Sequence, residues 1–198
     1  MIRTPADKKL RYLSKISSGF TLIELLIVIA VLGVLAVVIL IALNPNEQLR
    51  KTRDSGRVEA ISQIGNALQA YATSSDGFYV PEAGTGCTNT RWIDCLIDKG
   101  EIKTLPSLID YSNPNGVVAC TMVNVYNGIC YNASNPGGNS HPIVVYSTLE
   151  SQQNIDKCTN ISLTKPFAVF SSLLARGGVA CTNGTEPVPN MSNATFVD

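Results

Sequence analysis

Apolar residues divide the chain into one long apolar segment near its start and a mostly polar remainder. Residues 20–43 read FTLIELLIVIAVLGVLAVVILIAL, and Glu24 is their only charged residue. The 19 residues 25–43 are apolar apart from Gly33. A helix needs about 20 such residues to cross a hydrocarbon core of roughly 30 Å. The pattern therefore predicts a membrane-spanning helix with a carboxylate near its first turn.

The next segment, residues 44–72, predicts an amphipathic helix. Apolar residues recur there at spacings of three and four, which gives one packed and one wet face; they are Val58, Ile61, Ile64, Leu68 and Tyr71. Its start allows two interpretations. Asn44 can be the N-cap of a new helix with Pro45 at its first position, or Pro45 can kink one long helix, because proline has no backbone N–H. Both place a helix joint at Pro45.

Residues 73–198 predict one small head rich in Asn, Ser, Thr, Gly and Pro. RWIDCLIDK, residues 91–99, suggests a short helix, and LPSLIDYSNPNG, residues 105–116, suggests a loop. Short apolar runs predict strands, and Asn127-Gly128 is a signal for a two-residue hairpin turn; the runs are residues 117–126, 129–132, 143–149 and 167–173. The expected fold class is α+β, with a long N-terminal helix packed on a small antiparallel sheet.

Charge sets the expected orientation across the membrane. Residues 1–19 carry a net charge of +4 and the rest of the chain −4. The positive-inside rule places the basic leader in the cytoplasm and the head outside. Four basic residues just after the span oppose this, but nearby acids reduce that cluster to +1; the basic residues are Arg50, Lys51, Arg53 and Arg57. An acidic chain after the leader also has no general attraction for nucleic acid.

The junction between leader and span carries the motif that points to function. An ordinary secretory signal has its apolar region before the cleavage site, whereas here the apolar run follows Gly19. Gly19-Phe20-Thr21-Leu22-Ile23-Glu24 resembles the class III signal of type IV prepilins and type II secretion pseudopilins. That signal has a Gly before the cut, an aromatic first mature residue, and a Glu four residues further on.

This resemblance implies a processing route and a fibre. A prepilin peptidase and methyltransferase would cut after Gly19 and N-methylate Phe20. The Glu24 carboxylate would pair with the N-terminal ammonium of a neighbouring subunit, so that two charges costly in lipid are neutralised together. Copies of the chain or related pilins would polymerise through residues 20–43, driven by an assembly platform and ATPase. Some family members' helices melt locally in the fibre, and Gly33 and Pro45 bracket where this would occur.

All six cysteines lie after the span; they are Cys87, Cys95, Cys120, Cys130, Cys158 and Cys181. The charge distribution places this part of the chain outside the cytoplasm, where the environment is oxidising. Disulfides are expected. Six cysteines permit 15 connectivities, and short loops favour sequence neighbours, 87 with 95, 120 with 130 and 158 with 181. A two-residue turn at Asn127-Gly128 would not place Cys120 opposite Cys130. Either this disulfide or this turn is therefore wrong, or a β-bulge lies between the two cysteines. We expect bridges, rather than a large apolar core, to hold the head.

A weak internal repeat supports one of these pairs. PIVVYSTL begins at Pro142 and PFAVFSSL at Pro166, and each is followed by Cys-Thr-Asn, at Cys158 and Cys181. The repeat suggests that the two cysteines leave equivalent positions on neighbouring strands.

Catalytic motifs are absent from the sequence. It contains no phosphate-binding loop, HExxH or GxSxG. His141, the only histidine, is predicted to lie in a solvated Gly-rich turn, and Asp94 and Asp98 are too few for a calcium site, which takes 6 to 8 oxygens. No enzyme activity, cofactor or metal is expected. The sequence leaves two classes of function, a polymerised pilus or pseudopilus subunit and a membrane-anchored surface protein or enzyme that does not polymerise.

Overall fold

The computed structural model describes residues 19–88, 91–104, 125–126, 128–134 and 142–197. The chain divides into two compact units, Met1–Asn44 and Pro45–Asp198. Each unit is described by itself.

The described part of the first unit is the helix α1, Leu22–Leu43. Thr21 is its N-cap, and Asn44 ends it in the left-handed conformation, with φ 40° and ψ 76°. Within the described residues, α1 is the one helix long and apolar enough to cross a membrane, with a mean hydropathy of 3.2 over Leu22–Ile41.

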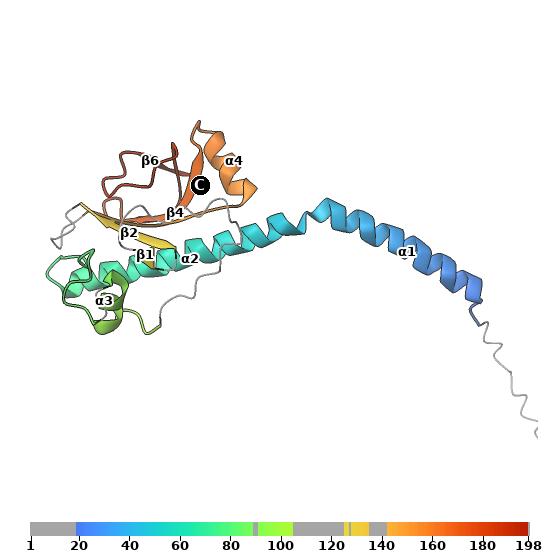
Figure 1. Cartoon of the computed structure of the whole chain (residues 1–198), viewed down its shortest axis with the longest axis horizontal. Helices are drawn as coiled ribbons and strands as arrows, with labels where there is room; N and C mark the ends of the chain where they lie inside the picture. Colours follow the sequence, from blue (N-terminus) through green and yellow to red (C-terminus); the bar gives the residue numbers. More distant parts are fainter. Residues whose placement is uncertain (1–18, 89–90, 105–124, 127, 135–141, 198) are drawn as a thin grey trace, which may run out of the picture. The chain divides into compact units, whose positions relative to one another are not determined.

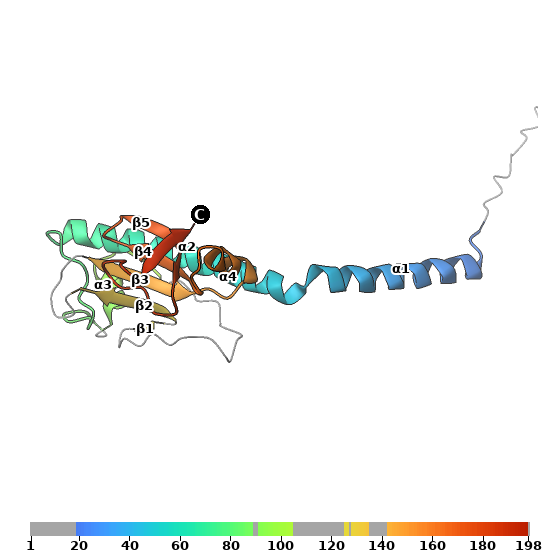
Figure 2. The ribbon, with the colours of Figure 1, turned by 90° about the horizontal axis from the view of Figure 1, so that it is seen from above.

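The second unit is a helix packed on an antiparallel sheet (Figure 1). Its helices are α2 (Pro45–Ser74), α3 (Trp92–Asp98) and α4 (Gln152–Thr159). Its strands are β1 (Val125–Tyr126), β2 (Ile129–Ala133), β3 (Ile143–Thr148), β4 (Lys165–Ser171), β5 (Arg176–Thr182) and β6 (Ala194–Val197). Among the described residues, the six strands follow one another across the sheet in chain order, each antiparallel to the last. Figure 2 shows β1 to β5 in this order from above. This is the α+β arrangement that the sequence predicts.

The main core lies between α2 and the sheet. Ile61, Ile64 and Leu68 of α2 are buried there. Gly65 faces Phe170 of β4 so closely that any side chain at this position would overlap the ring. Trp92 of α3 stacks on Tyr131 of β2 with 4.8 Å between ring centroids.

A second cluster fills the other face of the sheet and includes Cys130, Val144, Tyr146, Phe167, Val169, Ala180 and Met191. The expectation of a head without a large apolar core is therefore wrong. Successive residues of β2, β3 and β4 face opposite sides of the sheet, and both sides are covered. Each strand thus contributes to a core along its whole length, even though it is short.

Most predicted elements of the head have counterparts in the structure. Helix α3 lies within residues 91–99, and β2, β3 and β4 correspond to three of the predicted strands. Tyr126 pairs with Ile129, which leaves Asn127-Gly128 as the two-residue connection, and Gly128 has φ 79°. Helix α4 and strands β5 and β6 were not predicted. The loop at residues 105–116, and all of the first predicted strand except β1, lie outside the described residues.

Two of the three expected disulfides are present, Cys87–Cys95 and Cys158–Cys181. The third expected pair includes Cys120, which lies outside the described residues, and the residue opposite Cys130 in the sheet is Val125. The repeat argument for Cys158 and Cys181 is wrong, because Cys158 lies on α4 and Cys181 on β5. The repeated sequences are the neighbouring antiparallel strands β3 and β4.

Candidate functional site

The Gly19-Phe20 bond lies just before α1 and is open to an external partner. Both residues precede the helix, and Phe20 is 81% exposed. A side chain placed on Gly19 would meet no atom within 4 Å, and the backbone there is not in the left-handed region. Nothing in the described chain requires glycine at this position. If the position demands a glycine, the demand comes from a partner that approaches this bond.

Thr21 and Glu24 form a capping box at the start of α1. The Glu24 carboxylate accepts hydrogen bonds from Thr21 N at 3.3 Å and Thr21 Oγ1 at 3.1 Å, and Thr21 Oγ1 accepts one from Glu24 N at 3.3 Å. Both bonds to the carboxylate end on Oε2, which leaves Oε1 able to accept from a further donor. The negative charge also interacts favourably with the N-terminal end of the helix dipole. Glu24 is therefore held at the helix start, one turn from Phe20.

Helix α1 presents an apolar surface on every side. Its described large apolar side chains are 47 to 82% exposed. A helix that is apolar all round needs a lipid or protein environment on all sides. The helix runs unbroken through Gly33, and the break comes at Asn44, directly before Pro45. Local melting between Gly33 and Pro45 in a fibre stays a prediction.

Comparison with known proteins identifies the segment that contains this site. Residues 14–40 match the prokaryotic N-terminal methylation motif. This segment is the class III signal of type IV prepilins and pseudopilins. No curated protein and no solved structure matches the chain. The motif supports a pilin-type or pseudopilin-type precursor, and α1 fits a single-pass membrane anchor.

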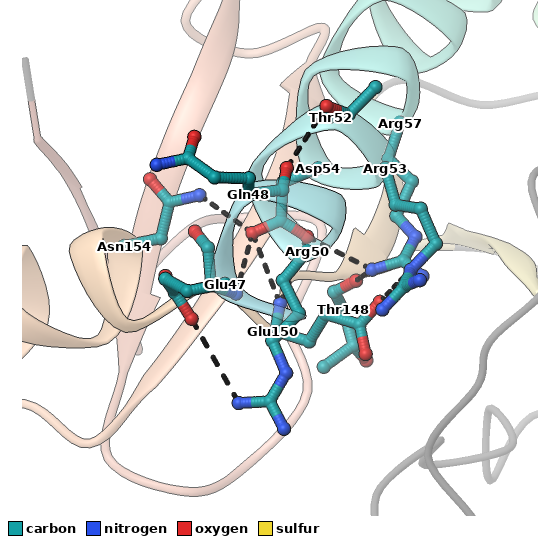
Figure 3. Close-up of polar contacts among 11 residues, drawn as sticks. Glu47, Gln48, Arg50, Thr52, Arg53, Asp54, Arg57, Thr148, Glu150 and Asn154 are labelled. Atoms are coloured by element: carbon teal, nitrogen blue, oxygen red, sulfur yellow. Dashed lines mark hydrogen bonds and ion pairs between the residues drawn. The ribbon is translucent and has the colours of Figure 1, made fainter. Parts of the chain in front are cut away.

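The head contains a network of buried and partly buried charges that the sequence does not predict (Figure 3). Asp54 and Arg57 are 2% and 1% exposed and form an ion pair at 3.0 Å. Glu150, which follows β3, pairs with Arg57 at 3.0 Å and with Arg53 at 2.6 Å. Arg57 also donates to Thr148 O at 3.3 Å. Arg53 and Arg57, two of the four basic residues that oppose the expected membrane orientation, are thus neutralised by acidic residues of the head.

A signal for this burial exists in the sequence. Asp54 and Arg57 continue the spacing of the apolar stripe, because positions 54, 57, 61, 64 and 68 alternate steps of three and four. Apolar spacing alone does not reveal these two positions, because both residues are charged. Its first two positions are polar because their partners come from the segment after β3, which no local pattern reveals.

The remaining polar groups of the head stabilise its fold. Tyr131 donates to Val80 O at 2.6 Å, and burial raises the pKa of its phenol well above the usual value. Burial also raises the pKa of Tyr146, which donates to Glu186 at 2.8 Å. Asp94 pairs with Arg91 at 2.6 Å, and Asp98 accepts from Thr88 N and Oγ1 at 2.8 Å each. No group of three His, Cys, Asp or Glu residues able to hold a metal ion occurs in the described part of the chain, and His141 lies outside it.

Proposed function

We propose that this chain is a structural subunit of a type IV pilus or a type II secretion-type pseudopilus. It is cut after Gly19, N-methylated at Phe20, and polymerised through α1. Three features together support the proposal: an accessible peptide bond between Gly19 and Phe20, the Glu24 carboxylate one turn further on, and a long helix that is apolar on every side.

The exposed surface of α1 explains why the chain needs two successive environments. Each large apolar side chain gains about 1.5 to 3 kcal/mol when it leaves water, so α1 is not stable as an exposed helix in water. Lipid covers it first. In a fibre, α1 helices of neighbouring copies would replace the lipid, so the same surface serves as anchor and then as subunit interface.

Glu24 makes this exchange selective. A carboxylate at the centre of a bilayer costs about 2.5 to 3.5 kcal/mol on insertion scales, and less near the edge. Cleavage after Gly19 would create an ammonium at Phe20, and the free oxygen position on Glu24 could accept from the ammonium of the next copy. Pairing neutralises both charges and fixes the axial register between neighbours.

The proposal names partners and a route. The leader lies in the cytoplasm, where a prepilin peptidase and methyltransferase acts, and the head lies outside. An assembly platform and its ATPase then move the subunit into an extracellular or periplasmic fibre. We expect no catalytic role and no nucleic-acid binding by the head.

Gly19→Leu tests the processing step, with Gly33→Leu as the matched control, because a Cβ at either position would meet no atom within 4 Å in the described structure. We expect Gly19→Leu to leave the chain at full length in the membrane and absent from sheared surface fibres, while Gly33→Leu is processed. Normal processing of Gly19→Leu would contradict the proposal. A processed chain that never appears in fibres would favour the unpolymerised surface anchor instead.

A further inference from the structure

The first three turns of α2 are held to the head by polar contacts. Apolar packing of α2 against the core begins at Val58. Between positions 45 and 57, the buried side chains in the described structure are those of Asp54 and Arg57. This segment directly follows α1 in the chain, so its attachment decides how firmly the end of the apolar helix is tied to the folded head.

The polar contacts of this segment converge on the start of α4. Asp54 accepts from Ser151 N at 2.8 Å, from Glu150 N at 3.0 Å and from Asn154 Nδ2 at 2.9 Å. Glu47 accepts from Gln152 N at 2.7 Å. Ser151 is the N-cap residue of α4, yet its own side chain makes no capping bond. Of these backbone donors, Gln152 N belongs to α4, and Glu150 N and Ser151 N immediately precede the helix. Carboxylates from α2 therefore lie at the start of α4, where they meet the positive end of its dipole.

A covalent bond anchors α4 to the sheet. Cys158 is the one buried residue of this eight-residue helix, and it is joined to Cys181 of β5. An isolated helix of this length is not stable in water. The helix is thus fixed at one end by the disulfide and at the other by the carboxylates of α2.

We propose that α4 is an oxidation-dependent brace that locks the first three turns of α2 to the head. The Cys158–Cys181 bond holds α4 in place, and with it the backbone donors of residues 150–152 that bind Asp54 and Glu47. Disulfides form outside the reducing cytoplasm, so the brace closes only after the head has crossed the membrane. From then on, the first three turns of α2 belong to the folded head. The proposal depends on neither cleavage nor polymerisation.

Hydrogen exchange of the full chain in detergent micelles tests the brace at the amides of residues 48–57. Cys158→Ala/Cys181→Ala removes the covalent anchor, and Asp54→Ala removes a carboxylate at the start of α4 while keeping the disulfide. We expect exchange at residues 48–57 to become about tenfold faster in both, because local opening no longer breaks these contacts. Exchange in β3 and at residues 61–68 should stay unchanged. The double cysteine substitution and Asp54→Ala interrupt the same connection between α2 and the sheet. A variant that combines them should therefore exchange no faster at residues 48–57 than either alone.

Two control variants separate the brace from general loosening. Cys87→Ala/Cys95→Ala removes the other described disulfide, and Glu59→Ala removes an exposed carboxylate of α2 that interacts with Gln63. Neither should affect residues 48–57. Unchanged exchange at residues 48–57 in Cys158→Ala/Cys181→Ala would overturn the proposal. Fast exchange throughout β3 would show that the double cysteine variant unfolds. In that case Asp54→Ala is the deciding variant, and unchanged exchange at residues 48–57 in Asp54→Ala would also overturn the proposal.

Discussion

Glu24 has two separable roles, a local cap and a proposed intersubunit charge, and substitution can distinguish them. Glu24→Gln keeps an oxygen that can accept from Thr21, since Gln also serves in capping boxes, but removes the charge. Thr21→Ala removes the cap and keeps the charge. Glu24→Ala removes the charge and the carboxylate half of the capping box, but keeps the backbone N–H that donates to Thr21 Oγ1. The three variants therefore assign any assembly defect to one role or the other.

The expected magnitudes differ enough to be measured. Loss of an N-cap costs about 0.5 to 2 kcal/mol, and this cost falls on the free subunit and the fibre alike, so it largely cancels in assembly. Removing one partner of a buried ion pair leaves the other charge uncompensated, at about 3 to 5 kcal/mol. With 1.4 kcal/mol for each factor of ten, Glu24→Gln should reduce incorporation by about two orders of magnitude or more. Thr21→Ala should reduce it by less than about tenfold.

The assay is a competition inside one fibre. Tagged variant and untagged wild-type chains are expressed together, and the ratio of the two is measured in membranes and in sheared fibres. Glu24→Gln and Glu24→Ala should be processed and inserted normally yet be strongly depleted from fibres, whereas Thr21→Ala should be present in them. Incorporation of Glu24→Gln at the wild-type level would refute the charge-pairing argument. Equal depletion of Thr21→Ala would assign the defect to capping.

Three further predictions concern the head. Non-reducing peptide mapping should recover Cys87 joined to Cys95 and Cys158 joined to Cys181, and these four as alkylated free thiols would contradict the fold. Gly65→Val should lower the free energy of unfolding by about 1 to 3 kcal/mol or more, because the added atoms overlap Phe170. If thermal denaturation shows that Gly65→Val is as stable as the wild type, α2 does not approach β4 this closely. The hydrogen bonds from Thr88 lower the pKa of the Asp98 carboxyl. Its small contribution to stability is therefore present above the unfolded-state pKa and is lost as pH falls through the lower folded-state pKa. Asp98→Asn should make the melting temperature depend less on pH in the acid range, and an unchanged dependence would reject this coupling.

The parts of the structure that sequence predicts are those specified by local patterns. The apolar run gives α1, the three-and-four spacing gives α2, and Asn127-Gly128 gives the β1–β2 connection. The N-terminal motif is likewise contiguous, so the sequence alone suffices to propose Gly19, Phe20 and Glu24 as site residues. Local patterns also account for the adjacent disulfide pairs.

The parts that sequence misses depend on distant partners. Helix α4 reads QQNIDKCT, with no apolar stripe, and is held by Cys181 and by carboxylates of α2. Strand β5 begins Arg-Gly-Gly, and these two glycines weaken any strand signal; Gly177 lies close to Ser62 of α2. Burial of Arg57 likewise requires Glu150, 93 positions away in the chain. The missing information lies in these pairings rather than in any one segment.

The N-terminus of the protein in sheared surface fibres tests the central claim most directly. Intact-mass and N-terminal peptide analysis of that material should find a chain that begins with N-methylated Phe20 and lacks residues 1–19. A fibre protein that begins at Met1, or at any residue other than Phe20, would contradict the proposed processing. Absence of the chain from both surface and periplasmic fibres of cells that express it would contradict the proposed polymerisation.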